Sequence, residues 1–389
     1  MTKMKRLLLI ADGPPRQGWG APIVLDRHLR RLVDGEWEVD IACLSEHAKT
    51  CSPCANWTVL PVHAHSILRN LPLRGMYRLC VFLWERQIRR SLASHPDCVL
   101  AVQQGARAHT DTAAAVARSL QVPLNLLILD HRERWEANPN HRRTQYRQTE
   151  ALFAQASRAW FVSERLIEEY GEHVRLPSPE VNRVLRPVPD GGSSARASWQ
   201  QGFSKQPVVV HSGAIQPTHR PVVLALADAL APLGGKLILV EKEGNPTVRG
   251  CVAERGNVEH VPFFPTNRQA VEFVAGKAAA AVHMYAFPPM TQGWATASFP
   301  SKLMEFTQTG VPMLLLTPPG TALHDWARAN EWLGLCDDLS AASLRRLLAP
   351  LCAQEGWERM AAQSLAAAQD EFSPRRIQRQ FEDELVVRE

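Results

Sequence analysis

The 389-residue chain is 45% hydrophobic and 21% charged, which is normal for a globular protein and excludes a chain that is disordered as a whole. Its length exceeds what one ordinary hydrophobic core supports, so two domains are expected. Residues 1–190 hold 26 Lys and Arg against 20 Asp and Glu, whereas the remainder holds 18 against 19. The net charge of +5 therefore lies in the N-terminal half, where it suits an anionic substrate, an anionic membrane surface or a solvated basic face without a partner.

The eight cysteines are scattered and several lie in apolar runs, as expected for reduced thiols in a cytosolic protein. Cys51 and Cys54 have the spacing of metal ligands, but no second such pair follows, so two incidental thiols in a loop are favoured and no metal site is expected. The apolar run at residues 7–11 is too short for a signal peptide, and no run reaches the ~20 apolar residues that span a bilayer. A cytoplasmic location is the expectation.

Short apolar runs alternate with helix-length amphipathic segments along the first half of the chain. The expected strands there are residues 7–11, 39–44, 57–62, 98–102, 124–129 and 159–162. After a polar segment rich in Gly, Ser and Pro at residues 187–206, the alternation restarts, with expected strands at 208–213, 236–240, 258–263, 278–284 and 313–316. Strands separated by helices predict parallel sheets covered on both faces, so we predict an α/β protein with two Rossmann-like domains.

The composition also predicts where the domains begin and end. We expect an N-terminal domain over residues 1–190, a linker over 191–206 and a C-terminal domain over 207–370. A separate terminal helix is expected over residues 371–389, because Ser373 suits an N-cap and Pro374 suits the first helical position.

Residues 298–312, SFPSKLMEFTQTGVP, predict a short helix that leads into the strand at 313–316. The backbone amides of Ser301 and Lys302 at its N-terminus, together with the lysine ammonium, suit a phosphate. Glu305 lies about one turn, ~5.4 Å, further along, where a ribose joined to a diphosphate can reach it. The alternative is a capped surface helix with a solvated lysine and glutamate.

Residues 299–316, FPSKLMEFTQTGVPMLLL, resemble the donor-site segment of retaining glycosyltransferases of family 4 in the GT-B superfamily, the group 1 glycosyl transferases. The resemblance implies two Rossmann-like domains facing a central cleft, with the C-terminal helix crossing back to the N-terminal domain. It also implies that Glu305 binds the ribose hydroxyls of a nucleotide sugar and that the segment before it, with Ser301 and Lys302, faces the diphosphate and the donor sugar.

Residues 208–220, VVVHSGAIQPTHR, resemble the strand, glycine loop and basic residue that open the donor domain of the same family. This implies that Gly213 approaches the phosphates and that either His219 or Arg220 binds them. Many relatives carry a second glutamate eight residues before the ribose-binding one, but that position here is Ala297. The donor sugar must then be recognised differently.

In the N-terminal domain, residues 12–20, DGPPRQGWG, resemble the glycine loop beside the donor phosphate and the acceptor, which implies roles for Gly18, Trp19 and Gly20. A tight turn between strand and helix is the alternative. Asp130 and His131 follow a predicted parallel strand, where ligands of open α/β sheets gather. The resemblance implies that His131 contacts the donor sugar, with Asp130 as its neighbour.

The resemblance implies transfer of a sugar from a nucleotide-diphosphate donor to an acceptor hydroxyl with retention, in the synthesis of bacterial surface polysaccharide or glycoconjugate. Lys302, His131 and Arg220 are the catalytic candidates, and positive groups would stabilise the leaving diphosphate without a metal or a cofactor. Two alternatives stay open: a catalytically silent GT-B protein that binds a glycan or a partner, and a sugar-nucleotide epimerase.

The expected acceptor is a glycan, a lipid-linked molecule or another hydroxyl compound, and no nucleic-acid partner is expected. Residues 64–94 interleave arginines with aromatic and aliphatic side chains. This pattern is typical of peripheral contact with an anionic membrane, here at its inner face, and equally of a core-facing helix with a basic outer face.

Overall fold

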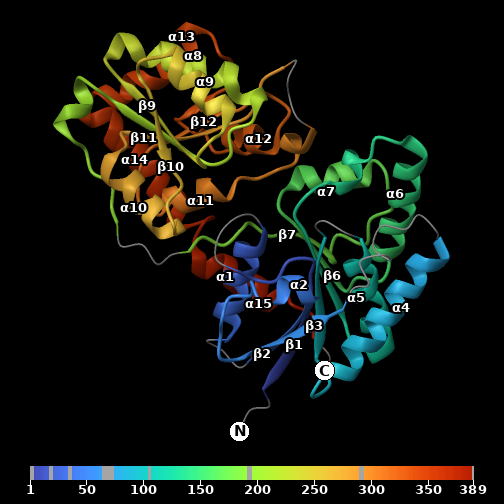
Figure 1. Ribbon diagram of the computed structural model, residues 1–389. Helices are drawn as coiled ribbons and strands as arrows, with labels where there is room; N and C mark the ends of the chain where they lie inside the picture. The colour runs from blue at the N-terminus through green and yellow to red at the C-terminus, as the bar shows by residue number, and fades with distance from the viewer. Residues whose placement is uncertain are drawn as a thin grey trace. The chain divides into compact units, whose positions relative to one another are not determined.

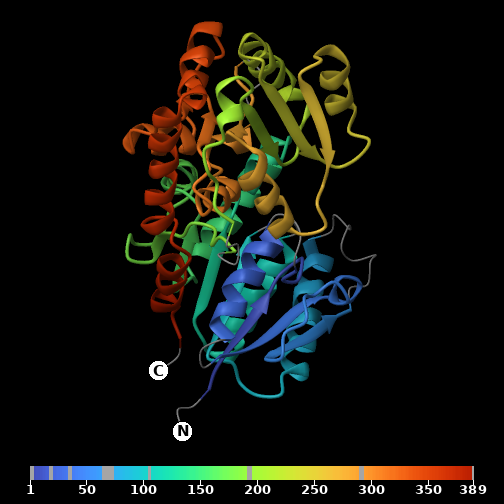
Figure 2. The same cartoon turned by 90° about the vertical axis from the view of Figure 1, so that its left-hand side faces the viewer.

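The computed structural model describes residues 4–16, 21–33, 37–63, 74–103, 107–190, 195–288 and 293–387. The chain forms two compact units, of which the first comprises Met1–Arg186 with Gln378–Glu389 and the second comprises Pro187–Ile377. Each unit is a parallel sheet with helices on both faces (Figure 1 and Figure 2). The prediction of two Rossmann-like α/β domains is therefore confirmed.

In the described residues of the first unit, the sheet has seven parallel strands in the order β3-β2-β1-β4-β5-β6-β7. Their bounds are β1 (Lys5–Ile10), β2 (Trp37–Leu44), β3 (Trp57–Val62), β4 (Cys98–Gln103), β5 (Leu124–Ile128), β6 (Arg158–Phe161) and β7 (Asn182–Val184). Every residue of β4 and β5 is buried. These strands read as continuous apolar runs because helices cover both of their faces.

The helices of the first unit lie on opposite sides of this sheet. Figure 1 shows α4 and α5 on one side and α1 with the C-terminal α15 on the other. The bounds are α1 (Ala21–Val33), α2 (Ser45–Ala48), α4 (Arg74–Ser91), α5 (Ala108–Leu120), α6 (Pro139–Phe153), α7 (Glu164–Gly171) and α15 (Pro374–Glu384). Local capping fixes some of these ends: the side chain of Asn138 accepts hydrogen bonds at the start of α6, and Ser163 does so at the start of α7.

From Gln378 onward, the C-terminal helix belongs to the first unit. The ring of Phe381 packs against the rings of His28 and Trp160, and the indole Nε1 of Trp160 donates to Glu384 at 2.7 Å. Nδ1 of His28 lies 3.0 Å from Oε1 of Gln378. The predicted return of this helix to the N-terminal domain is therefore confirmed.

The part of the second unit that the structure describes has six parallel strands in the order β10-β9-β8-β11-β12-β13. Their bounds are β8 (Val208–Ser212), β9 (Lys236–Glu241), β10 (Val258–Pro262), β11 (Ala280–Met284), β12 (Met313–Leu316) and β13 (Leu335–Cys336). The chain adds strands outward from β8 to β10 and then returns to place β11 on the other side of β8, so the direction of winding reverses between β8 and β11. In open α/β sheets, ligands bind outside the carboxyl ends of the strands at such a reversal.

Two hydrophobic cores cover the two faces of the second sheet. One core draws on α8 (Arg220–Leu230), α9 (Pro246–Glu254), α13 (Ala341–Leu348) and α14 (Gln354–Gln369). The other draws on α10 (Asn267–Lys277), α11 (Ser301–Thr307) and α12 (Ala322–Ala329).

Gly310 turns the chain from α11 into β12. Its φ is 77°, in the left-handed region that favours glycine, and a Cβ there would lie 2.9 Å from Cγ of Leu365. The glycine is therefore needed both for backbone conformation and for space, and it fixes where α11 stands relative to the sheet. Within the described ranges, the structure has no helix that is long and apolar enough to cross a bilayer.

Candidate functional site

Buried polar contacts fix the loop that follows β8. Glu241, at the end of β9 and only 2% exposed, accepts a hydrogen bond from the N–H of Ile215 at 2.6 Å. Nδ2 of Asn245 donates to the carbonyl of Ile215 at 2.8 Å. Because both backbone groups of Ile215 are satisfied by neighbouring elements, the loop has one defined course at the carboxyl edge of the sheet.

Three histidines lie where the two central strands of the second sheet end. His211 is in β8, His283 is in β11, and His219 ends the short η3 turn (Pro217–His219) after β8. Nε2 of His219 and Nε2 of His283 are buried, and no described residue gives either atom a hydrogen-bond partner. Buried polar atoms almost always have a partner, so each of these two nitrogens marks a position where a ligand or water is expected. His211 lies on the same face of the sheet as Val282, whereas His283 lies on the opposite face with Tyr285. We call these three residues the imidazole cluster.

The opposite ring nitrogens of two of these histidines bond to the backbone. Nδ1 of His211 donates to the carbonyl of Val282 at 3.1 Å, whereas Nδ1 of His219 accepts from the N–H of Gln216 at 3.1 Å. A neutral His219 ring must therefore carry its proton on Nε2, which makes that unpaired atom a donor. A Cβ at Gly213 would lie 3.4 Å from Nε2 of His211, so the backbone of Gly213 lies against this ring. A backbone hydrogen bond with Gly213 acts to raise the pKa of His211, against the larger effect of burial.

Burial keeps the imidazole cluster neutral at pH 7. Burial, with a smaller contribution from the neighbouring His219, lowers the pKa of His211 to about 4. Burial alone lowers the pKa of His219 to about 4. Burial, followed by the charges that His211 and His219 would carry, lowers the pKa of His283 to about 3. The ammonium of Lys302 also lowers the pKa of His211, so α11 approaches the cluster.

Asn267, the first residue of α10, links the two charged residues of α11. Nζ of Lys302 donates to Oδ1 of Asn267 at 2.6 Å, and Nδ2 of Asn267 donates to Oε2 of Glu305 at 3.1 Å. A reciprocal capping box between Thr266 and Gln269 fixes the start of α10. Glu305 is only 4% exposed. The second unit therefore holds a cation and a buried carboxylate one amide apart, beside the imidazole cluster.

The structure brings several of the predicted donor-site residues together. Gly213 and His219 lie at the imidazole cluster with Lys302, and Ser301 is the first residue of α11, preceded by Pro300 at the N-cap. Arg220 is placed differently, because it is exposed and forms an ion pair with Glu254 at the end of α9. The functional roles of all these residues stay predictions.

No protein-family model matches the sequence, and no curated protein matches it. Solved structures do match. The Anabaena protein HepE, solved with UDP and glucose, is 16% identical with a TM-score of 0.64, over 98% of each chain. Sucrose-phosphate synthase from Thermosynechococcus elongatus is 13% identical with a TM-score of 0.69, over 97% of this chain and 98% of its own. WaaG, a glycosyltransferase of lipopolysaccharide biosynthesis, is 14% identical with a TM-score of 0.61, over 96% of this chain and 98% of its own.

The chain has the GT-B fold. At identities of 13–16%, this likeness concerns the fold and transfers no activity or residue role.

In the N-terminal unit of this GT-B chain, His131 lies in a closed network of buried side chains. Its Nδ1 is 3.1 Å from Oε2 of Glu169, and the hydroxyl of Tyr146 is 3.1 Å from its Nε2. Oε1 of Glu169 pairs with Arg134 at 3.0 Å. The side chain of His131 is 1% exposed, so contact with a donor sugar would require one of these hydrogen bonds to open.

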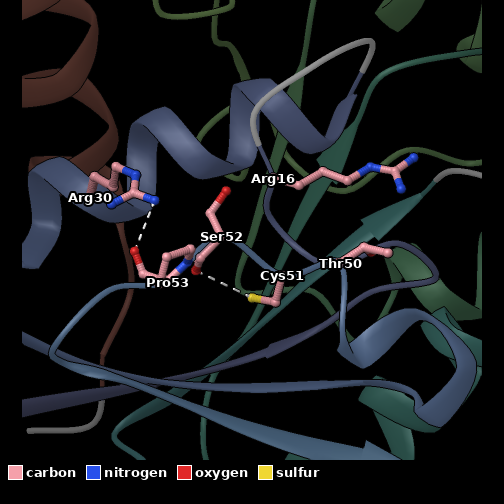
Figure 3. Close-up of a pocket in the computed structure, with 6 residues that line it drawn as sticks. All are labelled: Arg16, Arg30, Thr50, Cys51, Ser52 and Pro53. Carbon is pink, nitrogen blue, oxygen red and sulfur yellow. Dashed lines mark hydrogen bonds between the residues drawn. The ribbon is translucent and has the colours of Figure 1, made fainter.

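The other N-terminal candidates lie at the carboxyl edge of the first sheet. Asp130 follows β5, and burial raises the pKa of its carboxyl to about 6. Gly18, Trp19 and Gly20 lie outside the described residues. The chain just before them borders a cavity of about 610 Å³, which Figure 3 shows between the loop after β1, helix α1 and the loop after α2. Its lining residues are Arg16, Arg30, Thr50, Cys51, Ser52 and Pro53.

Sequence reasoning missed three residues of the site: His211, His283 and Asn267. A signal was present for the two histidines, because each is a polar residue near the carboxyl end of an apolar run that predicted a parallel strand. Asn267 gave no such signal, because its importance depends on α10 lying beside α11, 35 residues further along the chain.

Proposed function

We propose that the chain is a retaining glycosyltransferase, which transfers a sugar from a nucleotide-diphosphate donor to an acceptor hydroxyl. The observation that carries the proposal is the buried Nε2–H of His219, which has no partner among the described residues and lies, with Lys302, at the reversal point of the second sheet. A diphosphate offers acceptor oxygens to N–H donors and negative charge to the ammonium. The GT-B fold supports the same reading, since the solved neighbours include named glycosyltransferases.

The chemistry that the site must support is departure of a diphosphate. As the bond between the anomeric carbon and the phosphate oxygen breaks, negative charge grows on the diphosphate, and preorganised donors lower the energy of that state. Lys302 supplies a permanent charge, and Nε2–H of His219 supplies a donor that needs no reorientation. The acceptor hydroxyl adds to the same face of the sugar, and its proton passes to the departing phosphate. We propose that these protein groups act without a metal or a separate cofactor.

We propose that Glu305 holds the ribose of the donor. It lies on the same short helix as Lys302, and Asn267 orients both side chains. A buried carboxylate favours hydroxyl donors strongly, because hydrogen bonds to a charged acceptor are stronger than neutral ones. Ala297 is only 3% exposed and has no polar side-chain atom. We therefore propose that other groups recognise the sugar.

We also propose that the acceptor is a surface polysaccharide or a lipid-linked glycoconjugate and that the protein works in the cytoplasm against the inner face of the membrane. Helix α4 supports this. Its inward face carries buried Cys80, Trp84 and Ile88, whereas its outward face exposes Leu79 by 48%, Phe82 by 54% and Leu83 by 39%.

Four arginines share the outward face of α4 with these apolar side chains. Arg89 pairs with Glu85 at 3.0 Å, but the described structure shows no ion pair for the other three: Arg78, Arg86 and Arg90. A helix that presents both basic and large apolar side chains to solvent suits the interface of an anionic membrane.

The proposed activity is tested with the purified protein and a panel of UDP-, GDP-, ADP- and dTDP-sugars. Binding is followed by calorimetry, and turnover is followed by release of the nucleoside diphosphate. We expect one donor class to bind and to be hydrolysed slowly without an acceptor. Binding without any turnover, even with candidate acceptors, would favour a catalytically silent GT-B protein, and conversion of the donor to an epimer would favour an epimerase. Absence of binding would refute the proposal. NMR of the product linkage then distinguishes retention from inversion.

A further inference from the structure

Two arginines give the cavity of the first unit its charge. Figure 3 shows Arg30 of α1 at one end of this cavity and Arg16, on the loop after β1, toward the other end. None of the described residues that line the cavity is Asp or Glu. Burial raises the pKa of the Cys51 thiol to about 11, so this lining group is uncharged at pH 7. The described lining therefore carries positive charge and no negative charge.

Three contacts fix the guanidinium of Arg30. Its Nε donates to Oδ2 of Asp26 at 3.0 Å, and its Nη2 donates to the carbonyl of Pro53 at 3.1 Å. Its Cζ lies 5.1 Å from the centre of the Trp57 ring. The side chain is 34% exposed, and no hydrogen bond to a described residue uses Nη1. Asp26 balances the charge of Arg30, but the guanidinium keeps preorganised N–H donors for a carboxylate or phosphate group.

Arg16 supplies the net positive charge of the cavity. Its side chain is exposed, and within the described ranges it forms no ion pair. The backbone around it is held in place, because the N–H of Arg16 donates to the carbonyl of Pro22 at 3.3 Å and the N–H of Ser52 donates to the carbonyl of Pro15 at 2.9 Å. The loop after β1 is thereby joined both to α1 and to the loop after α2, so the three walls of the cavity have fixed relative positions.

The walls also offer oxygens that can accept from the hydroxyl groups of a sugar. Oγ1 of Thr50 donates to the carbonyl of His47 at 2.8 Å, and the same oxygen can still accept a hydrogen bond. The carbonyl of Ser52 accepts a long, weak bond from Sγ of Cys51 at 3.7 Å. The volume of about 610 Å³ lies within the range of roughly 300–1,000 Å³ of small-molecule sites. Donors and acceptors together favour a polar ligand with hydroxyl groups.

We propose that this cavity binds an anionic saccharide, whose carboxylate or phosphate groups pair with Arg16 and Arg30 and whose hydroxyls contact Thr50 and the carbonyl of Ser52. A guanidinium binds carboxylates and phosphates alike through paired N–H donors. The site uses no residue of the proposed donor site, so it goes beyond the proposed function. It also gives the acceptor a chemical class, an acidic glycan, and in that respect it rests on the proposed function.

The test is calorimetry of the intact protein, without nucleotide, with trigalacturonate, glucose 6-phosphate and the neutral trisaccharide maltotriose. The first two ligands distinguish a carboxylate from a phosphate. We expect at least one of them to bind at millimolar concentration, and maltotriose to bind at least about tenfold more weakly. High salt should weaken the binding of the anionic ligand and reduce this difference.

Arg16→Gln is the decisive variant, because it removes an exposed charge that has no described ion pair and should leave the fold intact. We expect the affinity for the anionic ligand to fall about tenfold. The matched control is Arg143→Gln, which removes an exposed arginine of α6 and should leave the affinity unchanged.

Thr50→Glu is the second variant, and it places a carboxylate in the lining. We expect it to weaken binding of the anionic ligand at least about fivefold by repulsion, whereas Thr58→Glu, at an exposed position of β3 outside the lining, should not. Unchanged affinity in both Arg16→Gln and Thr50→Glu overturns the inference, as does equal binding of maltotriose.

The same protein is titrated with UDP-, GDP-, ADP- and dTDP-sugars, which separates this inference from the proposed function. If neither anionic saccharide binds while a nucleotide sugar does, the inference is overturned and the proposed function stands. If an anionic saccharide binds and both variants weaken it, but no nucleotide sugar binds, the site is supported and the proposed function is refuted.

Discussion

Replacing Glu305 by glutamine tests the proposed ribose contact, because we expect it to weaken nucleotide binding while leaving the stability of the second unit nearly unchanged. Glu305 is 4% exposed and accepts a hydrogen bond from Nδ2 of Asn267 at 3.1 Å. A glutamine has the same shape and keeps an amide oxygen to accept that bond, so we expect the free energy of unfolding to change by less than about 1 kcal/mol. Glu305→Ala would instead leave the amide of Asn267 unpaired and a void in the core, and would mix the two effects.

What Glu305→Gln loses is the negative charge toward the ribose hydroxyls. A hydrogen bond to a charged acceptor is worth roughly 1 kcal/mol more than a neutral one, so two ribose hydroxyls lose about 2 kcal/mol. The dissociation constant of the nucleoside diphosphate should then rise roughly thirtyfold. Calorimetry measures it, and the 2′,3′-dideoxy nucleotide is the control, because it should bind both proteins alike. An unchanged dissociation constant, or an equal loss with the dideoxy nucleotide, would refute the assignment.

Three further predictions follow from local geometry. Arg220→Gln removes an exposed ion pair with Glu254, so we expect the free energy of unfolding to fall by less than about 1 kcal/mol. The dissociation constant of the nucleotide should stay within about twofold of the wild-type value. A tenfold loss of affinity would place Arg220 in the donor site. Gly310→Ala forces a Cβ to within 2.9 Å of Leu365 at a positive φ, and urea unfolding should show a loss of about 2 kcal/mol or more. Its control is Gly250→Ala in α9, where nothing lies within 4 Å and stability should rise slightly. Replacing the exposed apolar residues of α4, Leu79, Phe82 and Leu83, by serine should lower the amount of protein that sediments with phosphatidylglycerol vesicles at least tenfold. Equal binding of the wild-type protein to phosphatidylcholine vesicles would contradict the proposal that the arginines of α4 contact an anionic membrane.

The strands of both sheets were predictable because helices cover both faces of each sheet, and buried strands read as apolar runs. All eleven of the expected runs coincide with observed strands to within two residues at each end. The two strands that the sequence did not predict, β7 and β13, are edge strands of three and two residues. Strands this short leave no periodic pattern, and only their pairing with β6 and β12 defines them.

The candidate site was predictable where its residues are close in sequence and unpredictable where the sheet brings distant residues together. Lys302 and Glu305 belong to one local motif. His211 and His283 are 72 positions apart and lie on neighbouring strands only because β8 pairs with β11, with Val282 opposite His211. The structure places the two candidates His219 and Arg220 differently: the turn at the start of α8 directs the first side chain inward and leaves the second exposed. Which of them binds a phosphate stays a prediction.

The buried partners of His131 could not be read from the sequence. The family resemblance implies contact with the donor sugar, which stays a prediction, and Glu169 and Tyr146, 38 and 15 positions away, contact its two ring nitrogens. A residue at the carboxyl end of a parallel strand can serve the ligand or hold the surrounding chain in place, and only the positions of its partners distinguish these roles.

The most direct test of the central claim is a crystal structure of the protein with the nucleoside diphosphate that binds it. We predict phosphate oxygens within hydrogen-bond distance of Nε2 of His219 and of Nζ of Lys302, with the ribose hydroxyls on Glu305. Phosphates bound elsewhere, with Nε2 of His219 still lacking a partner, would contradict it.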